Sequence, residues 1–314
     1  MKLNHLASSA IVFSLTATVF SSSLLAGDLS DSKSSDGKAT TITKSDTTPT
    51  PLDLLTVDVN YTADSSVRQG PSLGKQSATH SSIDYSHRFH VSGNWYLRLG
   101  VAYERFDFDH NVGPLPTHLQ AASATIAYEY VVQGYPAAAI ELHPGFYFEN
   151  AATGRTFAVP VDVYSAFPIE KDKVFGMIGF YTSPFISPPV FPLGGIIWLI
   201  NDKVRLEALF PRPALIYTMN DDWEFRLTGD VGGGGFRMDK SATTGPFSHP
   251  GSVLQYEYEQ AGAEARYTHW KGVNIVFGGG YSFEREFDFF RDGPLQKYKA
   301  VGAPYLKAAV ELKF

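Results

Sequence analysis

The last seven residues, AAVELKF at positions 308–314, alternate strictly between two kinds of side chain. The apolar parity holds Ala308, Val310, Leu312 and Phe314, and the other parity holds Ala309, Glu311 and Lys313. Successive side chains of a strand point to opposite faces of a sheet, so the alternation predicts a strand with one apolar and one polar face. Because chain termini usually fray, a regular pattern kept to the final residue indicates that this strand is held by a neighbour.

The period of two seen at 308–314 continues through most of the chain from Leu52 onward, with about fourteen segments of strand length. The expected strands are 52–62, 80–91, 95–106, 119–131, 137–149, 156–167, 173–182, 191–200, 203–210, 214–219, 222–231, 252–267, 273–286 and 303–314. Many approach the roughly 9–11 residues of a tilted membrane-spanning strand. The segments from 173 to 219 alternate least regularly, which leaves a count of about twelve open.

The connections between these strands alternate between short and long. Short turns are expected at 92–94, 133–135, 168–172, 201–202, 220–222 and 268–272, and longer links at 63–79, 107–118, 150–155, 183–190, 211–213, 232–251 and 287–302. An up-and-down barrel has this arrangement, with a short-turn rim and a long-loop rim. The link 211–213 is too short for its rim, so either the barrel dips there or the strands are placed wrongly.

All four tryptophans are expected at the short-turn rim: Trp95, Trp198, Trp223 and Trp270. Tryptophan prefers the boundary between water and hydrocarbon, so this placement fits a barrel in a membrane. Tryptophans in the core of a soluble β-sandwich are the alternative interpretation, and a sandwich would also alternate, with its apolar face inward.

The first 27 residues have the features of a secretory signal peptide. Lys2 is basic, residues 10–25 form an apolar stretch diluted by Ser and Thr, and the small residues Ala26 and Gly27 follow. An uncleaved anchor helix is the alternative. Residues 28–51 are rich in Ser, Thr, Asp and Lys, which predicts a disordered polar linker before a barrel at 52–314. No later apolar run approaches the roughly 18 residues that a spanning helix needs.

The composition excludes several classes of function. The net charge of −6 argues against a nucleic-acid partner, which would need a basic surface. The chain has no cysteine, which excludes disulfides, thiolate metal sites and a cysteine nucleophile. We expect no catalytic residue, cofactor or metal site.

The strongest functional indication is charge on the polar face of the predicted strands. That face of a barrel lines the lumen. The candidate lumen-lining residues are Arg88, Arg98, Glu104, Glu141, Glu224, Arg226, Glu264 and Arg266. Arginines opposite glutamates would create a transverse field in a water-filled pore. Alternatively, the charges pair with one another and fill the lumen.

Four further motifs have alternative interpretations. FDFDHN at 106–111 could offer oxygen ligands to Ca²⁺, or could be a solvated acidic loop. GGGG at 232–235 marks a bulge or the start of a loop rather than a phosphate-binding loop, because no lysine and helix follow. FEREFDFFRD at 283–292 combines rim aromatics with solvated charges. Tyr256 and Tyr258 fall out of step with the alanines that follow, which predicts a β-bulge near 260–262.

The end of the chain resembles bacterial outer-membrane β-barrel proteins, which commonly finish on an aromatic residue preceded by apolar residues at alternate positions. Here these positions are Leu306, Ala308, Val310, Leu312 and Phe314. The resemblance implies a strand read by the barrel-assembly machinery, location in the bacterial outer membrane, and contact with its lipids and lipopolysaccharide. The segment 209–236 also resembles an exported-barrel family of unknown function.

The function expected from these features is a passive channel for small solutes. A transporter similar to the fatty-acid barrels is one alternative, although residues 28–51 are too polar and short to resemble the plug of those proteins. A structural or adhesive barrel is another. A barrel enzyme acting on lipid would need a base such as His87 beside a serine, but Ser86 is expected on the opposite face.

Overall fold

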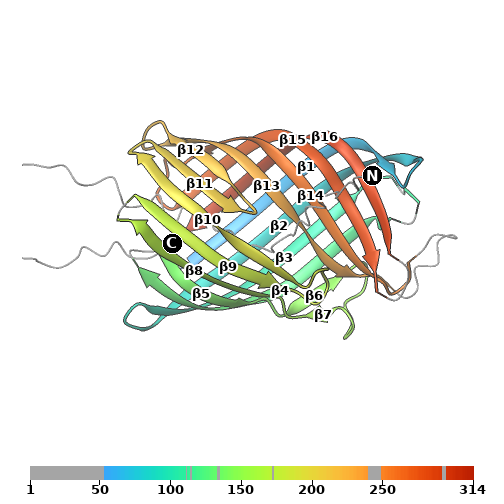
Figure 1. Cartoon of the computed structure of the whole chain (residues 1–314), viewed down its shortest axis with the longest axis horizontal. Coiled ribbons are helices and arrows are strands. Elements are labelled where there is room, and N and C mark those ends of the chain that lie inside the picture. Colours follow the sequence, from blue (N-terminus) through green and yellow to red (C-terminus); the bar gives the residue numbers. More distant parts are fainter. Residues whose placement is uncertain are drawn as a thin grey trace, which may run out of the picture.

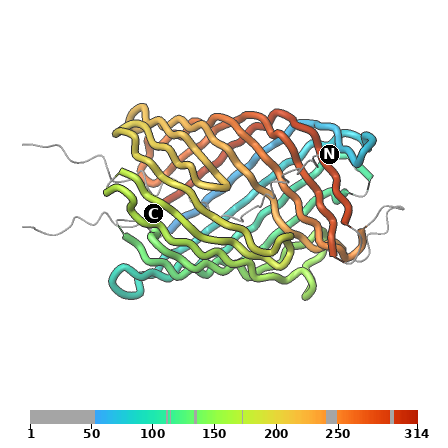
Figure 2. The backbone as a smooth tube through the Cα atoms, viewed as in Figure 1, coloured from blue at the N-terminus to red at the C-terminus, as the bar shows by residue number. Residues whose placement is uncertain are grey.

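The protein is an antiparallel β-barrel in a computed structural model that describes residues 53–110, 112–113, 115–132, 135–171, 173–239, 249–291 and 295–314 (Figures 1 and 2). The described residues form one sixteen-stranded sheet. Two short strands, β6 and β7, prolong β5 and β8 beyond breaks at residues 143–144 and 159–160, so the wall contains fourteen strands in up-and-down order. The expected signal peptide and linker lie outside the described residues, and no helix among the described residues is long and apolar enough to cross a bilayer.

The strands differ greatly in length. Their bounds are β1 Asp53–Arg68, β2 Ser72–Ser92, β3 Trp95–Phe108, β4 His118–Val132, β5 Tyr135–Leu142, β6 Gly145–Phe148, β7 Phe157–Ala158, β8 Val161–Glu170, β9 Val174–Thr182, β10 Val190–Asn201, β11 Val204–Phe210, β12 Ala214–Thr218, β13 Trp223–Arg237, β14 Val253–Tyr267, β15 Val273–Phe290 and β16 Gln296–Lys313. β11 and β12 have 7 and 5 residues, whereas β2 has 21. The barrel does dip at 211–213, where β11 and β12 stop far short of β14–β16 (Figure 1).

The terminal strand closes the barrel. β16 pairs with β1 in the register Val57↔Val310, and the Asp53 N–H donates to the Phe314 carbonyl oxygen at 2.9 Å. Leu306 and Phe314 are 69% and 68% exposed on the outer surface, while Glu311 is buried inside. Both described ends of the chain therefore lie at the short-turn rim.

Apolar side chains cover the outer surface next to the short-turn rim. The most exposed include Val101, Ile178, Leu227, Phe277 and Leu306. Trp95, Trp198 and Trp270 are exposed at the same rim, and Trp95 stacks on Tyr128 at 4.8 Å. The backbone groups of the wall pair with one another, so hydrocarbon can surround this half without leaving them unsatisfied. We call it the membrane half.

The pattern inverts in the half next to the long-loop rim, which we call the loop half. In β15 an extra residue, Phe283, lies opposite the Glu259–Gln260 step of β14 and forms a bulge. Before the bulge, charge points inward and apolar groups outward. Beyond it, Phe287 is fully buried inside, whereas Glu284 pairs with Lys299 outside at 2.6 Å. The loop half thus has an apolar interior and a charged exterior, as a water-surrounded barrel would.

Only part of the wall rises into the loop half. There β13 pairs directly with β6 through a parallel bridge, Arg237↔Phe148, and the Glu149 N–H donates to the Arg237 carbonyl oxygen at 3.3 Å. β8 to β12 end lower, and the loop 183–189 between β9 and β10 fills the space beside β13. Phe185 of this loop is buried in the apolar core of the loop half.

Several sequence-based predictions need correction. The link expected at 63–79 is a turn of only three residues, 69–71, because β1 and β2 extend to Arg68 and from Ser72. The stretch 107–109 belongs largely to β3 and its end, with Phe106 and Phe108 buried inside, and no group of three metal-binding side chains occurs among the described residues.

The glycines at 232–235 do not begin a loop, because β13 continues through them to Arg237. A Cβ on Gly235 would lie 2.0 Å from the Phe185 carbonyl oxygen, so the glycine permits the close approach of loop 183–189. The predicted bulge near 260–262 is also displaced: β14 keeps its parity, and Tyr256 and Tyr258 point inward like Glu264. Within 283–292, Phe287 and Phe289 likewise form core rather than rim, whereas Phe283 is 55% exposed.

Candidate functional site: a charged cavity in the membrane half

A cavity of about 490 Å³ occupies the barrel interior at the level of the apolar outer surface. Its lining comes from most of the wall strands and from the turn 211–213. Inward-facing positions of neighbouring strands form this lining because each strand turns alternate residues to the lumen. The cavity is polar wherever these positions carry charged, amide or hydroxyl side chains, such as Asp58, Asn60 and Thr125.

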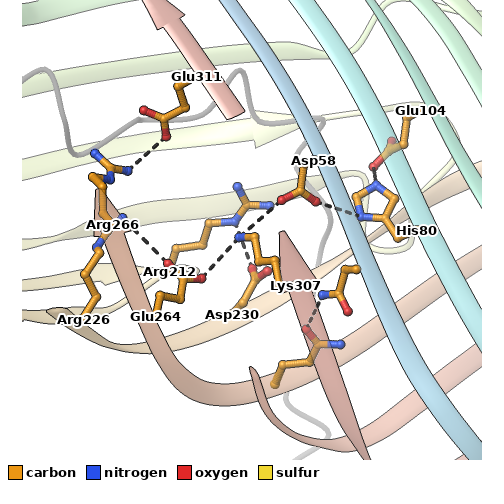
Figure 3. A network of polar contacts seen from close by, with 12 residues as sticks. Asp58, His80, Glu104, Arg212, Arg226, Asp230, Glu264, Arg266, Lys307 and Glu311 are labelled. Atoms are coloured by element: carbon orange, nitrogen blue, oxygen red, sulfur yellow. Dashed lines mark hydrogen bonds and ion pairs between the residues drawn. The ribbon is translucent and has the colours of Figure 1, made fainter. Parts of the chain in front are cut away.

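Seven charged or titratable side chains meet across the middle of the cavity (Figure 3). We call them the girdle: Asp58, His80, Glu104, Arg212, Asp230, Glu264 and Lys307. β1, β2, β3, β13, β14 and β16 contribute one each, and Arg212 reaches in from the 211–213 turn. The dip of the wall at β11 and β12 brings this turn to the level of the cavity.

The girdle is joined by short polar contacts. The His80 ring lies between two carboxylates, with Nε2 2.8 Å from Glu104 Oε1 and Nδ1 4.0 Å from Asp58 Oδ1. Lys307 Nζ lies 3.3 Å from Glu264 Oε1 and 3.7 Å from Asp58 Oδ2. Arg212 Nε donates to Asp230 Oδ1 at 2.9 Å.

Two denser ion clusters lie between the girdle and the short-turn rim. In the first, Arg88 Nε donates to Glu129 at 2.7 Å, and Arg98 donates to Glu129 at 2.7 Å and to Glu141 at 2.6 Å. In the second, Arg266 Nη2 donates to Glu311 Oε1 at 3.0 Å. Arg226 lies within 4.0 Å of Glu207, Glu224 and Glu264.

The eight candidate lumen residues therefore all lie inside the barrel, and all except Arg226, whose side chain is 11% exposed, are buried. They are not arranged as arginines facing glutamates across the lumen. Each cluster mixes both signs, so the charges pair with neighbours on the same side. Glu104 and Glu264 belong to the girdle, while the other six belong to the two ion clusters.

Sequence reasoning missed five members of the girdle: Asp58, His80, Arg212, Asp230 and Lys307. Asp58 and Lys307 fall on the polar parity of 52–62 and 303–314, so alternation could have identified them. Arg212 carries no such signal, because it lies in a turn whose depth depends on the lengths of β11 and β12.

An aromatic core closes the cavity toward the long-loop rim. Phe106, Tyr256 and Phe287 are at most 2% exposed, and the Phe106 and Tyr256 rings meet at 5.1 Å. Phe185 reaches the same core from loop 183–189. The cavity and the loop rim are thus separated by well-packed apolar side chains.

The residues considered for lipid chemistry do not form a catalytic pair. His87 lies on the outer side and its Nδ1 is 2.8 Å from Asp53 Oδ1. The Ser86 side chain is 1% exposed and points into the barrel. The barrel wall therefore lies between the two side chains.

A closed barrel with an apolar outer belt and a charged interior defines a β-barrel of the outer-membrane type. Similar solved structures are bacterial outer-membrane barrels. An outer-membrane channel from Pseudomonas putida F1 shares 9% identity, with 87% of this chain and 100% of that chain covered and a TM-score of 0.43. The Pseudomonas putida toluene transporter TodX shares 10% identity over 83% and 89% of the two chains, with a TM-score of 0.33. Neisserial surface protein A shares 12% identity over 83% and 97%, with a TM-score of 0.21.

No family model and no curated protein matches the sequence. The resemblance of segment 209–236 to an exported-barrel family therefore remains a prediction.

Proposed function

We propose that the protein is exported to the outer membrane and is a passive channel for small solutes, without enzymatic activity. The observation that carries the proposal is the 490 Å³ charged cavity inside the part of the barrel that is apolar outside. A barrel that only anchored a partner would gain nothing from buried charges in its lumen, because charges removed from water are expensive unless paired or hydrated.

A solute that moves from the cavity to the long-loop rim has to pass the aromatic core. Loop 183–189 is one piece of this barrier that does not belong to the sheet, and Val112 and Leu115 between β3 and β4 are another. The Ser187 N–H donates to Gln255 Oε1 at 2.8 Å, and Arg291 Nη2 donates to the Pro184 carbonyl oxygen at 2.8 Å. A few such contacts can break without disturbing the wall, so we propose that outward movement of this loop opens the channel above β8–β12.

The proposal is tested by recording purified, refolded protein in a planar lipid bilayer. We expect stepwise conductance in salt solution. A protein that inserts, shown by heat-modifiable gel migration, yet stays silent at all voltages would refute the channel.

The role of loop 183–189 is tested by cross-linking, which is clean because the chain has no cysteine. In the variant Ser187→Cys/Gln255→Cys, a disulfide or a short bismaleimide should hold the loop closed and abolish openings. The matched control joins Ser66→Cys to Ser72→Cys, whose hydroxyl oxygens lie 3.0 Å apart in the β1–β2 hairpin. The control should leave conductance unchanged, and equal conductance of both cross-linked proteins would refute the loop's role.

A further inference from the structure

The girdle has an excess of negative charge. It contains four carboxylates and two fixed cations, Arg212 and Lys307, so it carries two surplus negative charges with His80 neutral and one with His80 protonated. The cavity as a whole also has an excess of negative charge, since its lining includes seven carboxylates but only five lysines and arginines. The ion clusters below it do not cancel this excess: Arg226 lies 4.0 Å from Glu264 of the girdle, but it lies closer to Glu207 and Glu224 of its own cluster.

A second observation is independent of the carboxylates. Asn60 lines the cavity beside the girdle and is 6% exposed. Its Nδ2 donates to Gln260 Oε1 at 2.9 Å, which leaves the Oδ1 acceptor pointing elsewhere. Among the described residues this Oδ1 has no hydrogen-bond partner, and neither has the hydroxyl of Thr56 on the same strand. A buried acceptor without a donor is costly. Both oxygens are enclosed in this conformation, so a small side-chain rotation has to turn them to the cavity before a ligand or water that donates N–H or O–H can satisfy them.

The two observations describe one binding environment. Asp58 lies two residues from both Thr56 and Asn60 on the lumen face of β1, and its carboxylate oxygens lie 3.7 Å from Lys307 Nζ and 4.0 Å from His80 Nδ1. A positively charged group placed here gains Coulomb attraction that low-dielectric walls strengthen. An anion would meet the surplus carboxylates instead. Rings of acidic side chains select cations in channels for this reason.

We propose that the girdle, with Asn60 and Thr56, is a binding site for small cations and that the protein favours cations, in particular small amines, over anions. Only the preference for cations during transport rests on the proposed channel function. Binding at the girdle does not require the channel to open toward the long-loop rim.

Binding is tested by titrating the detergent-solubilised protein with two dicharged probes of equal chain length. We expect 1,4-diaminobutane to bind and succinate not to bind at the same ionic strength. The variant Asp58→Asn should weaken diaminobutane binding about tenfold, the effect of losing one good charged contact. The matched control Asp202→Asn, in the exposed β10–β11 turn, should bind as the wild type does.

Selectivity is tested from the reversal potential in a KCl gradient. We expect K⁺ to be preferred over Cl⁻ about tenfold, because a negative lumen concentrates counter-ions. Lys307→Gln should increase this preference and Asp58→Asn should decrease it. Adding salt on both sides should reduce it, since the screening length falls below about 8 Å.

The outcomes separate the inference from the function on which it rests. A conducting protein with equal or anion-favouring permeability would overturn the inference while leaving the channel intact. A silent protein would refute the channel, and the titration would still decide the binding site. Succinate binding as tight as diaminobutane binding, or no binding of the diamine to the wild type, would overturn the site in either case.

Discussion

Replacing Arg98 by methionine (R98M) tests whether the charged interior is a dry, paired structure or a well-hydrated lumen. Arg98 lies on β3 and is 8% exposed. Its guanidinium donates to Glu129 at 2.7 Å and to Glu141 at 2.6 Å. Methionine keeps much of the side-chain volume but removes the charge, so Glu129 and Glu141 each lose a short charged contact inside the barrel. Arg88 still donates to Glu129, and His143 Nε2 lies 3.4 Å from Glu141.

The expected loss follows from this burial. Removing one partner of a buried ion pair costs about 3–5 kcal/mol, because an uncompensated charge remains. With a urea dependence of about 3 kcal/mol per molar, the unfolding midpoint should fall by about 1–1.7 M. The same strand supplies the control. Arg105 pairs with Asp107 on the outer side, where the side chains are 36% and 42% exposed. The variant Arg105→Met should cost at most about 1 kcal/mol.

The assay is equilibrium unfolding in urea, with the folded barrel followed by tryptophan fluorescence and by heat-modifiable gel migration. A double variant, Arg98→Met with Glu141→Gln, should recover more than about 1 kcal/mol of the lost free energy of unfolding, because it removes the charge of the carboxylate that Arg98 contacted. Equal midpoints for Arg98→Met and Arg105→Met would refute the reasoning. They would mean that water solvates the interior carboxylates as well as it solvates the outer surface.

Two further predictions concern the loop half and the chain end. Gly235→Ala should raise the open probability in bilayer recordings, because the new Cβ would lie 2.0 Å from the Phe185 carbonyl oxygen and displace loop 183–189. Its control is Gly154→Ala, where an added Cβ would meet no atom within 4 Å, and a response shared by both variants would contradict this explanation. Phe314→Ser should reduce the yield of heat-modifiable barrel in the outer membrane, because Phe314 is a 68% exposed apolar anchor at the end of the closing strand. The barrel that does assemble should keep wild-type ion selectivity, and unchanged yield with altered selectivity would contradict the assigned role.

The membrane half was largely predictable because its strands obey one rule. Alternation placed Leu306, Val310 and Phe314 outside and Glu311 inside, as the structure has them. The prediction of fourteen strands was correct for the same reason, since each apolar stripe has to face hydrocarbon. The eight candidate charges were found on the polar face, although alternation alone could not say which of them pair.

The loop half was predicted poorly because the solvent outside it changes. Hydrocarbon gives way to water near Phe283, so the apolar side chains turn inward and the bulge in β15 changes the parity. Thus Phe287 was assigned to a rim of aromatic side chains although it is buried, and the 63–79 segment was assigned to a loop. A prediction that always places apolar side chains on the outer face of the barrel is therefore wrong beyond this bulge.

The sequence by itself determined the barrel, its strand count, its terminal strand and the face on which charge lies, because these depend on local alternation and turn signals. Only the tertiary structure decided which charges meet. Arg212 reaches Asp230 because β11 and β12 are short, and Lys307 comes within 4.0 Å of Asp58 because β16 closes against β1. Such contacts depend on the strand register and the shear of the whole barrel, and neither quantity can be inferred from the sequence of a single strand.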